Sequence, residues 1–150
     1  MSKMQTQSCH FCTHDGGEIL ASNALLRMIA PHEPEFPGLI RVVWNAHIAE
    51  MTDLPPEQRS AMMQVVCQVE QLIRDVLRPH KVNLASFGNF VPHLHWHVIP
   101  RWEDDSYFPE SIWGVKLREV PAELLKHRHE QAEDLFEAIR SFDFKSKYNA

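Results

Sequence analysis

The spacing of apolar residues predicts one long helix in the middle of the chain. Through residues 61–77 apolar side chains recur every three or four positions for more than four turns, which is the period of a helix with one buried face. Pro55 and Pro56 suit its opening turn, Asp53 is a candidate capping residue, and Pro79 marks its end. We therefore expect an amphipathic helix between these prolines.

Shorter apolar runs predict strands before and after this helix. Residues 39–44 are typical of a largely buried strand, and residues 82–87 and 92–101 of two more, with a turn at Gly88 and Asn89 between them. The N-terminal portion combines a Gly-Gly turn with short apolar pieces, which is consistent with a hairpin or a helical turn that leads into strands.

The last third of the chain is predicted to hold a loop and a second helix. An acidic, aromatic segment follows Trp102, and its composition indicates irregular structure. Pro121 then opens a helix with apolar residues along one side and charged residues along the other. Because the chain shows no internal repeat, low-complexity tract or linker, residues 1–150 are expected to form a single α+β domain.

One predicted strand carries a row of histidines. Successive side chains of a strand point to opposite faces, so His93, His95 and His97 share one face and the apolar residues between them share the other. The simplest interpretation is a half-buried strand with surface histidines. Histidine is not a favoured strand residue, however, so three histidines in strict alternation favour a chemical role for these side chains. A metal site and a nucleophilic imidazole both fit, and the spacing does not separate them.

Composition narrows the function classes. The chain of 150 residues is 44% hydrophobic and has a formal net charge of −5 with histidines neutral. No run of Lys and Arg is present, so we expect no nucleic-acid partner and favour a small ligand. No apolar stretch approaches the roughly 18 residues of a membrane span, and the start lacks the apolar core of a secretory signal. We therefore expect a cytoplasmic protein with no membrane partner.

Two cysteines near the start are candidates for metal or redox chemistry. Cys9 and Cys12 are closely spaced, and in a reducing compartment this spacing favours a metal or redox site over a structural disulfide. Cys67 falls within the helical pattern, where we expect it to pack as a small apolar group.

Residues 93–99, HLHWHVI, closely resemble the motif of the histidine triad (HIT) family, in which three histidines alternate with apolar residues. The resemblance extends to the Cys-x-x-Cys near the start, the Pro37-Gly38 turn, His47 and the Gly-Asn pair before the triad, and covers about residues 9–102. It implies the HIT-like α+β fold, an antiparallel sheet of about five strands with one long central helix. Residues 103–150 would form a C-terminal loop and helix.

The resemblance implies an enzyme that acts on nucleotides. His95 would attack the α-phosphate of a nucleoside phosphoramidate or dinucleoside polyphosphate and form a covalent nucleotidyl-histidine intermediate, which water then resolves. His97 would contact the phosphate and assist the leaving group. The backbone carbonyl near His93 would accept a hydrogen bond from the other ring nitrogen of His95 and so fix its tautomer.

Four residues are candidates for nucleotide binding: Asn83, Asn89, His97 and Arg101. Arg101 lies on the histidine face of its strand, where it would contact a distal phosphate or only pair with Glu103 or Asp104. Two positions depart from the family pattern. Leu39 stands where many relatives have a histidine, and Ala30 lies near the position of an aspartate that binds the ribose, for which Glu33 is a candidate replacement.

In zinc-containing relatives the metal is held by a Cys-x-x-Cys pair, a histidine at the end of the earlier strand and the first triad histidine. The matching residues here are Cys9, Cys12, His47 and His93. Two sulfur and two nitrogen ligands make a closed tetrahedral set, which is typical of structural zinc. The resemblance therefore implies a structural zinc ion that ties the N-terminal segment to the histidine strand.

Two other functions remain open at this point. A non-catalytic protein that binds or senses a nucleotide and holds a structural zinc is the main alternative, because the ribose-binding aspartate is missing. A metallohydrolase would hold zinc on two triad histidines and activate water there, but the closed set of four ligands argues against it. Because HIT proteins commonly dimerise, we also expect a homodimer.

Overall fold

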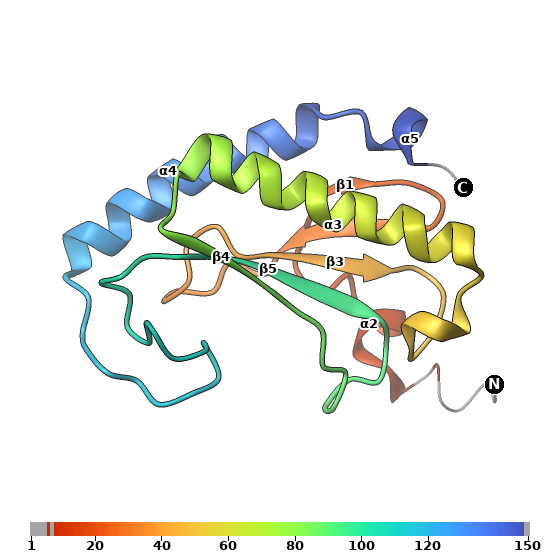
Figure 1. Cartoon of the computed structure of the whole chain (residues 1–150), viewed down its shortest axis with the longest axis horizontal. Helices are drawn as coiled ribbons and strands as arrows, with labels where there is room; N and C mark the ends of the chain where they lie inside the picture. Colours follow the sequence, from red (N-terminus) through yellow and green to blue (C-terminus); the bar gives the residue numbers. More distant parts are fainter. Residues whose placement is uncertain (1–5, 7, 149–150) are drawn as a thin grey trace.

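The computed structural model describes Thr6 and residues 8–148 (Figure 1). Its elements in chain order are α2 (His10–Thr13), β1 (Glu18–Ser22), β2 (Leu26–Ala30), β3 (Ile40–Trp44), the 3-10 helix η1 (Met51–Asp53), α3 (Pro56–Leu77), β4 (Lys81–Ala85), β5 (His95–Arg101), α4 (Ala122–Ser141) and α5 (Phe144–Lys147). The predicted α+β class, with a five-stranded sheet, a long helix and a C-terminal helix, is confirmed.

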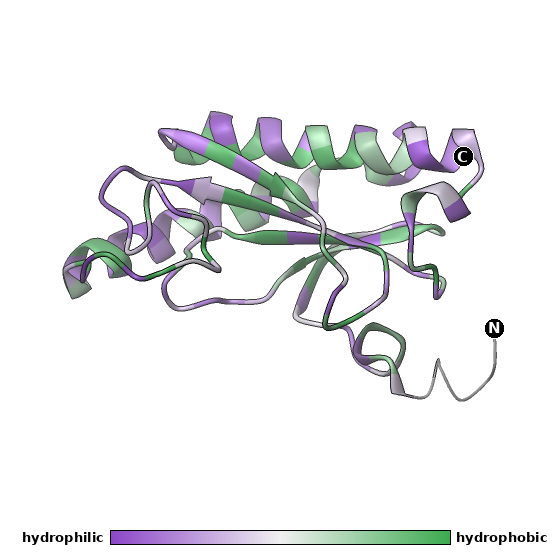
Figure 2. Ribbon diagram, turned by 60° about the horizontal axis from the view of Figure 1, so that its bottom comes forward, coloured by the Kyte–Doolittle hydropathy of each residue, from purple (hydrophilic) through white to green (hydrophobic). Residues whose placement is uncertain are grey.

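The sheet has the strand order β1-β2-β3-β5-β4, and all neighbouring strands are antiparallel. The long helices α3 and α4 lie on one side of it and α2 lies on the other (Figure 1). The larger apolar cluster, which includes Val42 and Val98, packs beneath α3 and α4, and a smaller one around Phe11 and Val43 includes the start of α2. Polar and apolar bands alternate along the strands (Figure 2), so polar side chains can lie on the face away from the long helices.

Helix α3 follows the predicted period but not the predicted cap. Its buried residues are Ala61, Met62, Val65, Val66, Val69, Ile73 and Leu77, and each large aliphatic side chain buried in this way contributes roughly 1.5–3 kcal/mol. The predicted capping role of Asp53 is wrong, because Pro55 is the N-cap residue and Asp53 belongs to η1. There its carboxylate accepts a hydrogen bond from the backbone N–H of Glu50 at 3.2 Å.

The connection between β4 and β5 is longer than the predicted two-residue turn. The ladder between these strands begins at Ala85 and His97, so residues 86–94 lie outside both strands. Leu94 instead bonds to the chain that follows β3, donating its N–H to Ile48 at 2.6 Å and accepting from Trp44 at 3.0 Å. These bonds draw the segment before β5 toward the end of β3, which is where the predicted metal ligands lie.

The predicted turn before β3 depends on a glycine. Gly38 has a φ of 81°, and a Cβ atom there would lie 2.6 Å from the Cδ1 atom of Leu77. The turn therefore combines a left-handed backbone with a close approach of the end of α3, and both conditions favour glycine.

The C-terminal part of the chain covers the sheet with a second long helix. As predicted, α4 begins directly after Pro121, and it packs against α3 and β1. The short α5 follows, which the apolar pattern did not indicate. In the described part of the chain, no helix combines the length and the apolar character that crossing a membrane requires.

Candidate active site and metal site

Two triad histidines lie side by side on the face of β5 opposite the long helices. In the antiparallel ladder with β3, His95 pairs with Val43 and His97 pairs with Arg41. Their exposed fractions are 7% and 8%. Both histidines line a cavity of about 430 Å³, to which Asn89 also contributes. The predicted histidine face therefore opens into a cavity rather than onto bulk solvent.

The ring of His95 is held in one orientation. Its Nδ1 atom donates a hydrogen bond to the backbone carbonyl of His93 at 2.6 Å, which leaves Nε2 as the ring nitrogen with a free lone pair. Burial lowers the pKa of His95, and the positive charge of Arg41 lowers it further although the bond to His93 opposes the change. A neutral imidazole with a fixed tautomer is the form that can act as a nucleophile.

His97 is the second triad histidine at the cavity, and its environment strongly disfavours the charged form. Burial lowers its pKa to about 3, with further contributions from His95 and Arg41. Its Nδ1 atom is buried and has no hydrogen-bond partner among the described residues. The ring of Trp113 packs against it edge-on at 4.9 Å between centroids. In the free protein His97 is therefore neutral at pH 7.

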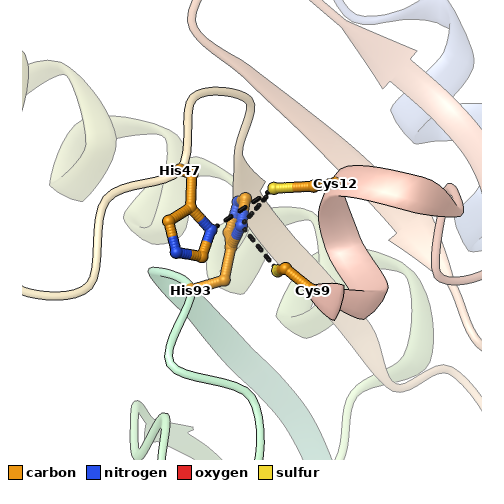
Figure 3. Close-up of side chains that lie close together, drawn as sticks. All are labelled: Cys9, Cys12, His47 and His93. Carbon is orange, nitrogen blue, oxygen red and sulfur yellow. Dashed lines mark hydrogen bonds between the residues drawn. The ribbon is translucent and has the colours of Figure 1, made fainter. Parts of the chain in front are cut away.

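The four predicted metal ligands lie together (Figure 3). The candidate ligand atoms of Cys9, Cys12, His47 and His93 are all within 4.8 Å of one another. The Nδ1 atom of His93 is 3.4 Å from the sulfur of Cys9 and 3.5 Å from that of Cys12, which is 3.3 Å from Nδ1 of His47. Sulfur and nitrogen ligands of a tetrahedral zinc ion lie roughly 3.5 Å apart, so the cluster fits such an ion.

His93 is oriented for metal binding by a second hydrogen bond. Its Nε2 atom donates to the backbone carbonyl of Trp44 at 2.5 Å, which directs the lone pair of Nδ1 toward the two sulfur atoms. Burial lowers the pKa of His93 and thereby favours the neutral form that binds metals. Only this triad histidine belongs to the cluster within the described chain, which argues against a metal shared by two of them.

Arg27 fixes the segment that carries the cysteines, a role that the sequence analysis missed. It lies in β2 and donates hydrogen bonds to the backbone carbonyls of Phe11 at 2.8 Å and Asp15 at 3.1 Å. A third bond runs to the Oδ1 atom of Asn45 at 3.2 Å. The available signal was a single arginine inside an otherwise apolar strand, which indicates a specific partner for a buried charge.

Two predicted nucleotide-binding residues lie away from the cavity. The guanidinium of Arg101 is buried and binds Asp105 through two hydrogen bonds, of 2.7 and 3.1 Å, and Asn83 through one of 2.8 Å. Arg101 therefore pairs with Asp105 rather than with Glu103 or Asp104, and it is not among the residues that line the cavity. The physical reason is that the loop after β5 folds back and supplies Asp105 as its partner.

The loop after β5 also forms part of the cavity wall. Trp113 packs edge-on against Phe87 at 4.9 Å between ring centroids, and both are partly exposed at the cavity rim. Phe90, in the connection before β5, is fully exposed beside them. Of the aromatic residues in this loop, Trp113 thus lines the cavity of its own chain.

The comparison with protein families agrees with this geometry. The model of the HIT domain matches residues 17–104. The chain belongs to the HIT family. The match contains β1 to β5, α3 and the three triad histidines, while α2 with Cys9 and Cys12 precedes it and α4 follows it.

Known HIT relatives include enzymes that are longer than this chain. A protein named AP-4-A phosphorylase from Mycobacterium tuberculosis is 30% identical over 107 residues, which cover 67% of this chain and 55% of the relative. A bis(5'-nucleosyl)-tetraphosphatase [asymmetrical] from Schizosaccharomyces pombe is 26% identical over 95 residues, covering 60% and 52%. The chain therefore spans about half the length of the curated relatives it matches.

A solved HIT structure shows the same fold. The crystal structure of a Zn-bound histidine triad family protein from Mycobacterium smegmatis has a TM-score of 0.57 and 22% sequence identity to this chain. It covers 89% of this chain, and the match extends over 99% of that one.

Proposed function

We propose that this protein is a HIT hydrolase or nucleotidyl transferase that cleaves a nucleotide at its α-phosphate through a covalent intermediate on His95. The observation that carries the proposal is the bond from Nδ1 of His95 to the carbonyl of His93. It leaves the lone pair of Nε2 available for attack on phosphorus in the cavity.

The proposed reaction has two displacements. Nε2 of His95 forms a bond to the α-phosphorus while the bond from phosphorus to the leaving group breaks. Water then forms a bond to the phosphorus and gives up a proton to the solvent while the bond from phosphorus to Nε2 breaks. This step releases the nucleoside monophosphate and returns His95 to its neutral state. A transferase would use another acceptor, such as phosphate, in place of water.

His97 and Asn89 are the proposed partners of the nucleotide. Because His97 is neutral in the free protein, it must gain a proton before it can protonate a leaving group. A bound phosphate would raise the pKa of His97 through its negative charge and so favour that proton. Asn89, exposed at the cavity, would donate or accept a hydrogen bond at the rim.

The names of the curated relatives favour dinucleoside polyphosphates as the substrate class. Phosphorylases and tetraphosphatases of such compounds share the attack at phosphorus and differ in the acceptor, phosphate in the first and water in the second. Nucleoside phosphoramidates present the same α-phosphate and remain within the proposal.

The proposal includes a structural zinc ion held by Cys9, Cys12, His47 and His93. The fit of these two sulfur and two nitrogen atoms to a tetrahedron supports it. Such an ion has no open position for a substrate, and its contribution would be to fix α2 and the ring of His93, whose carbonyl orients His95.

The test is the intact mass of the protein after rapid mixing with diadenosine tetraphosphate or adenosine phosphoramidate. The quench must be alkaline or denaturing because the bond between phosphorus and histidine is labile to acid. We expect an adenylyl adduct on the wild type and none on His95→Ala, with equal metal content in both. His127→Ala, which changes an exposed histidine on α4, should form the adduct as the wild type does.

Two outcomes would contradict the proposed function. An adduct that persists in His95→Ala would place the covalent chemistry on another residue. If the wild type binds the ligand but yields neither adduct nor AMP, the protein is a nucleotide-binding protein without turnover.

A further inference from the structure

Arg41 places a charge in the middle of the sheet, beside the triad. It lies on β3, the central strand, whose other residues are apolar. In the ladder it pairs directly with His97, so both side chains rise from the same face into the same cavity. The side chain of Arg41 is 22% exposed.

The protein satisfies this guanidinium only in part. Its Nη2 atom donates to Glu33 at 3.2 Å, but its Nε atom is buried and has no hydrogen-bond partner among the described residues. The buried Nδ1 of His97 on the paired position lacks a partner as well. A buried donor without a partner is unfavourable, so the described residues leave the guanidinium of Arg41 incompletely hydrogen-bonded.

Arg41 also determines the charge of the cavity. It is the only Arg or Lys among the described residues that line it, and no carboxylate lines it. His97 is neutral there because burial lowers its pKa. An arginine stays protonated throughout the physiological pH range, so Arg41 is a permanent cation next to the proposed nucleophile.

Its ion pair with Glu33 does not account for this arrangement. The two side chains are 22% and 40% exposed, and ion pairs this accessible to water contribute little to stability. The carboxylate contacts one nitrogen of the guanidinium, so other donors of the planar group remain for a ligand. Phosphate oxygens match such a group in both charge and geometry.

We propose that Arg41 is a catalytic-site residue that binds the phosphate on which His95 acts, with its guanidinium held in place by Glu33. Rather than a histidine cation, arginine supplies the positive charge opposite the phosphate oxygens, and His97 remains free for the leaving group. This inference deepens the proposed function and rests on its assignment of the cavity to a nucleotide.

The test compares the affinities of AMP and adenosine, which differ only in the phosphate, by calorimetry on the metal-containing protein. For Arg41→Gln we expect AMP to bind at least about tenfold more weakly and adenosine to bind as tightly as to the wild type. Arg41→Lys keeps a charge but loses the planar fork, so its AMP affinity should fall between the two.

Arg140→Gln is the matched control. It also removes an arginine from an ion pair with glutamate, but this pair lies at the exposed surface and away from the cavity. We expect it to bind AMP and adenosine as the wild type does. If Arg41→Gln does not fold, Arg41→Lys must still weaken AMP selectively.

Two results would overturn the inference: equal AMP affinity in the wild type and the Arg41 variants, or an equal loss of AMP and adenosine affinity. The outcome is separable from that of the proposed function. AMP binding that depends on Arg41, without any adduct on His95, would contradict the covalent mechanism alone. An adduct on His95, combined with an AMP affinity that does not change in the Arg41 variants, would contradict this inference alone.

Discussion

His97 is a buried side chain that the fold holds in its neutral form. Burial and the neighbouring Arg41 lower its pKa to about 3, and the buried Nδ1 atom has no partner in the described chain. The unfolded chain binds a proton at this residue near pH 6.5. Because the unfolded state binds more protons between these values, His97 lowers stability as the pH falls from about 6.5 toward 3.

We therefore predict that His97→Gln makes stability less dependent on pH. Between pH 7 and pH 5 the wild type should lose about 2 kcal/mol of unfolding free energy through this one group, in addition to losses from His93 and His95, whose pKa values are also lowered. Urea unfolding of both proteins at the two pH values, at matched metal content, measures the difference. Parallel losses in wild type and variant would contradict the prediction.

Arg41 and Arg101 show how two arginines on the same face acquire different roles. Arg101 is enclosed by the carboxylate of Asp105 and the amide of Asn83. Burial alone would raise the pKa of Asp105, but the hydrogen bonds from Arg101 and from the backbone N–H groups of Tyr107 and Phe108 hold it below its ordinary value. Arg41 has one partly exposed carboxylate as its partner and a cavity beside it. Residue type alone does not separate the two cases.

At the scale of single elements, α2 depends on contacts outside itself. It is four residues long and has no side-chain cap, and isolated helices of this length are unstable in water. Its position is set by hydrogen bonds from Arg27 to the chain around it and by the packing of Phe11 against His93 and His95. A metal ion on Cys9 and Cys12 would add the strongest of these constraints.

We predict that Cys12→Ser loses the metal and destabilises the protein, while Cys67→Ser does neither. Cys67 is exposed on α3, so the expectation that it packs as a small apolar group is wrong. For Cys12→Ser the loss should be about 3 kcal/mol or more, the stabilisation from a ligand present at over a hundred times its Kd. Metal analysis and urea unfolding measure both effects. A chelator should destabilise the wild type and Cys67→Ser but leave Cys12→Ser unchanged, and metal retained by Cys12→Ser would exclude the proposed ligand set.

At the scale of the whole molecule, the two faces of the sheet differ. One face packs against α3 and α4 and holds the larger apolar cluster, and the other faces the cavity of the candidate site. The face at the cavity carries His95, His97 and Arg41, and the four candidate metal ligands come from segments outside the strands. At one end of the strand order, β4 is an edge strand with the partly exposed Leu84, and unpaired backbone groups at such an edge can join a second sheet.

The expected assembly is a homodimer. Light scattering coupled to gel filtration should give about twice the chain mass of 17.5 kDa across a dilution series. A mass near that of one chain at every concentration would contradict this prediction, and the site residues described here would then have to act within single chains.

Local patterns were sufficient to locate the two long helices and the strand that carries His95 and His97. The helical period located α3, Pro121 located the start of α4, and the alternation of residues 93–99 placed two histidines on one face. These features are set by neighbours in sequence, because the period of a helix or strand fixes which side chains share a face. The sequence also named all four members of the metal cluster, through the family resemblance.

Only the tertiary structure decided which partners meet across distant segments. The register of β3 against β5 pairs Arg41 with His97. The loop after β5 folds back, so that Asp105 accepts a hydrogen bond from Arg101. Hydrogen bonds of Leu94 with Trp44 and Ile48 hold the segment before β5 at the end of β3, and the connection is longer than the predicted turn. Such contacts depend on strand pairing and loop closure between segments far apart in sequence, and local periodicity carries no information about either.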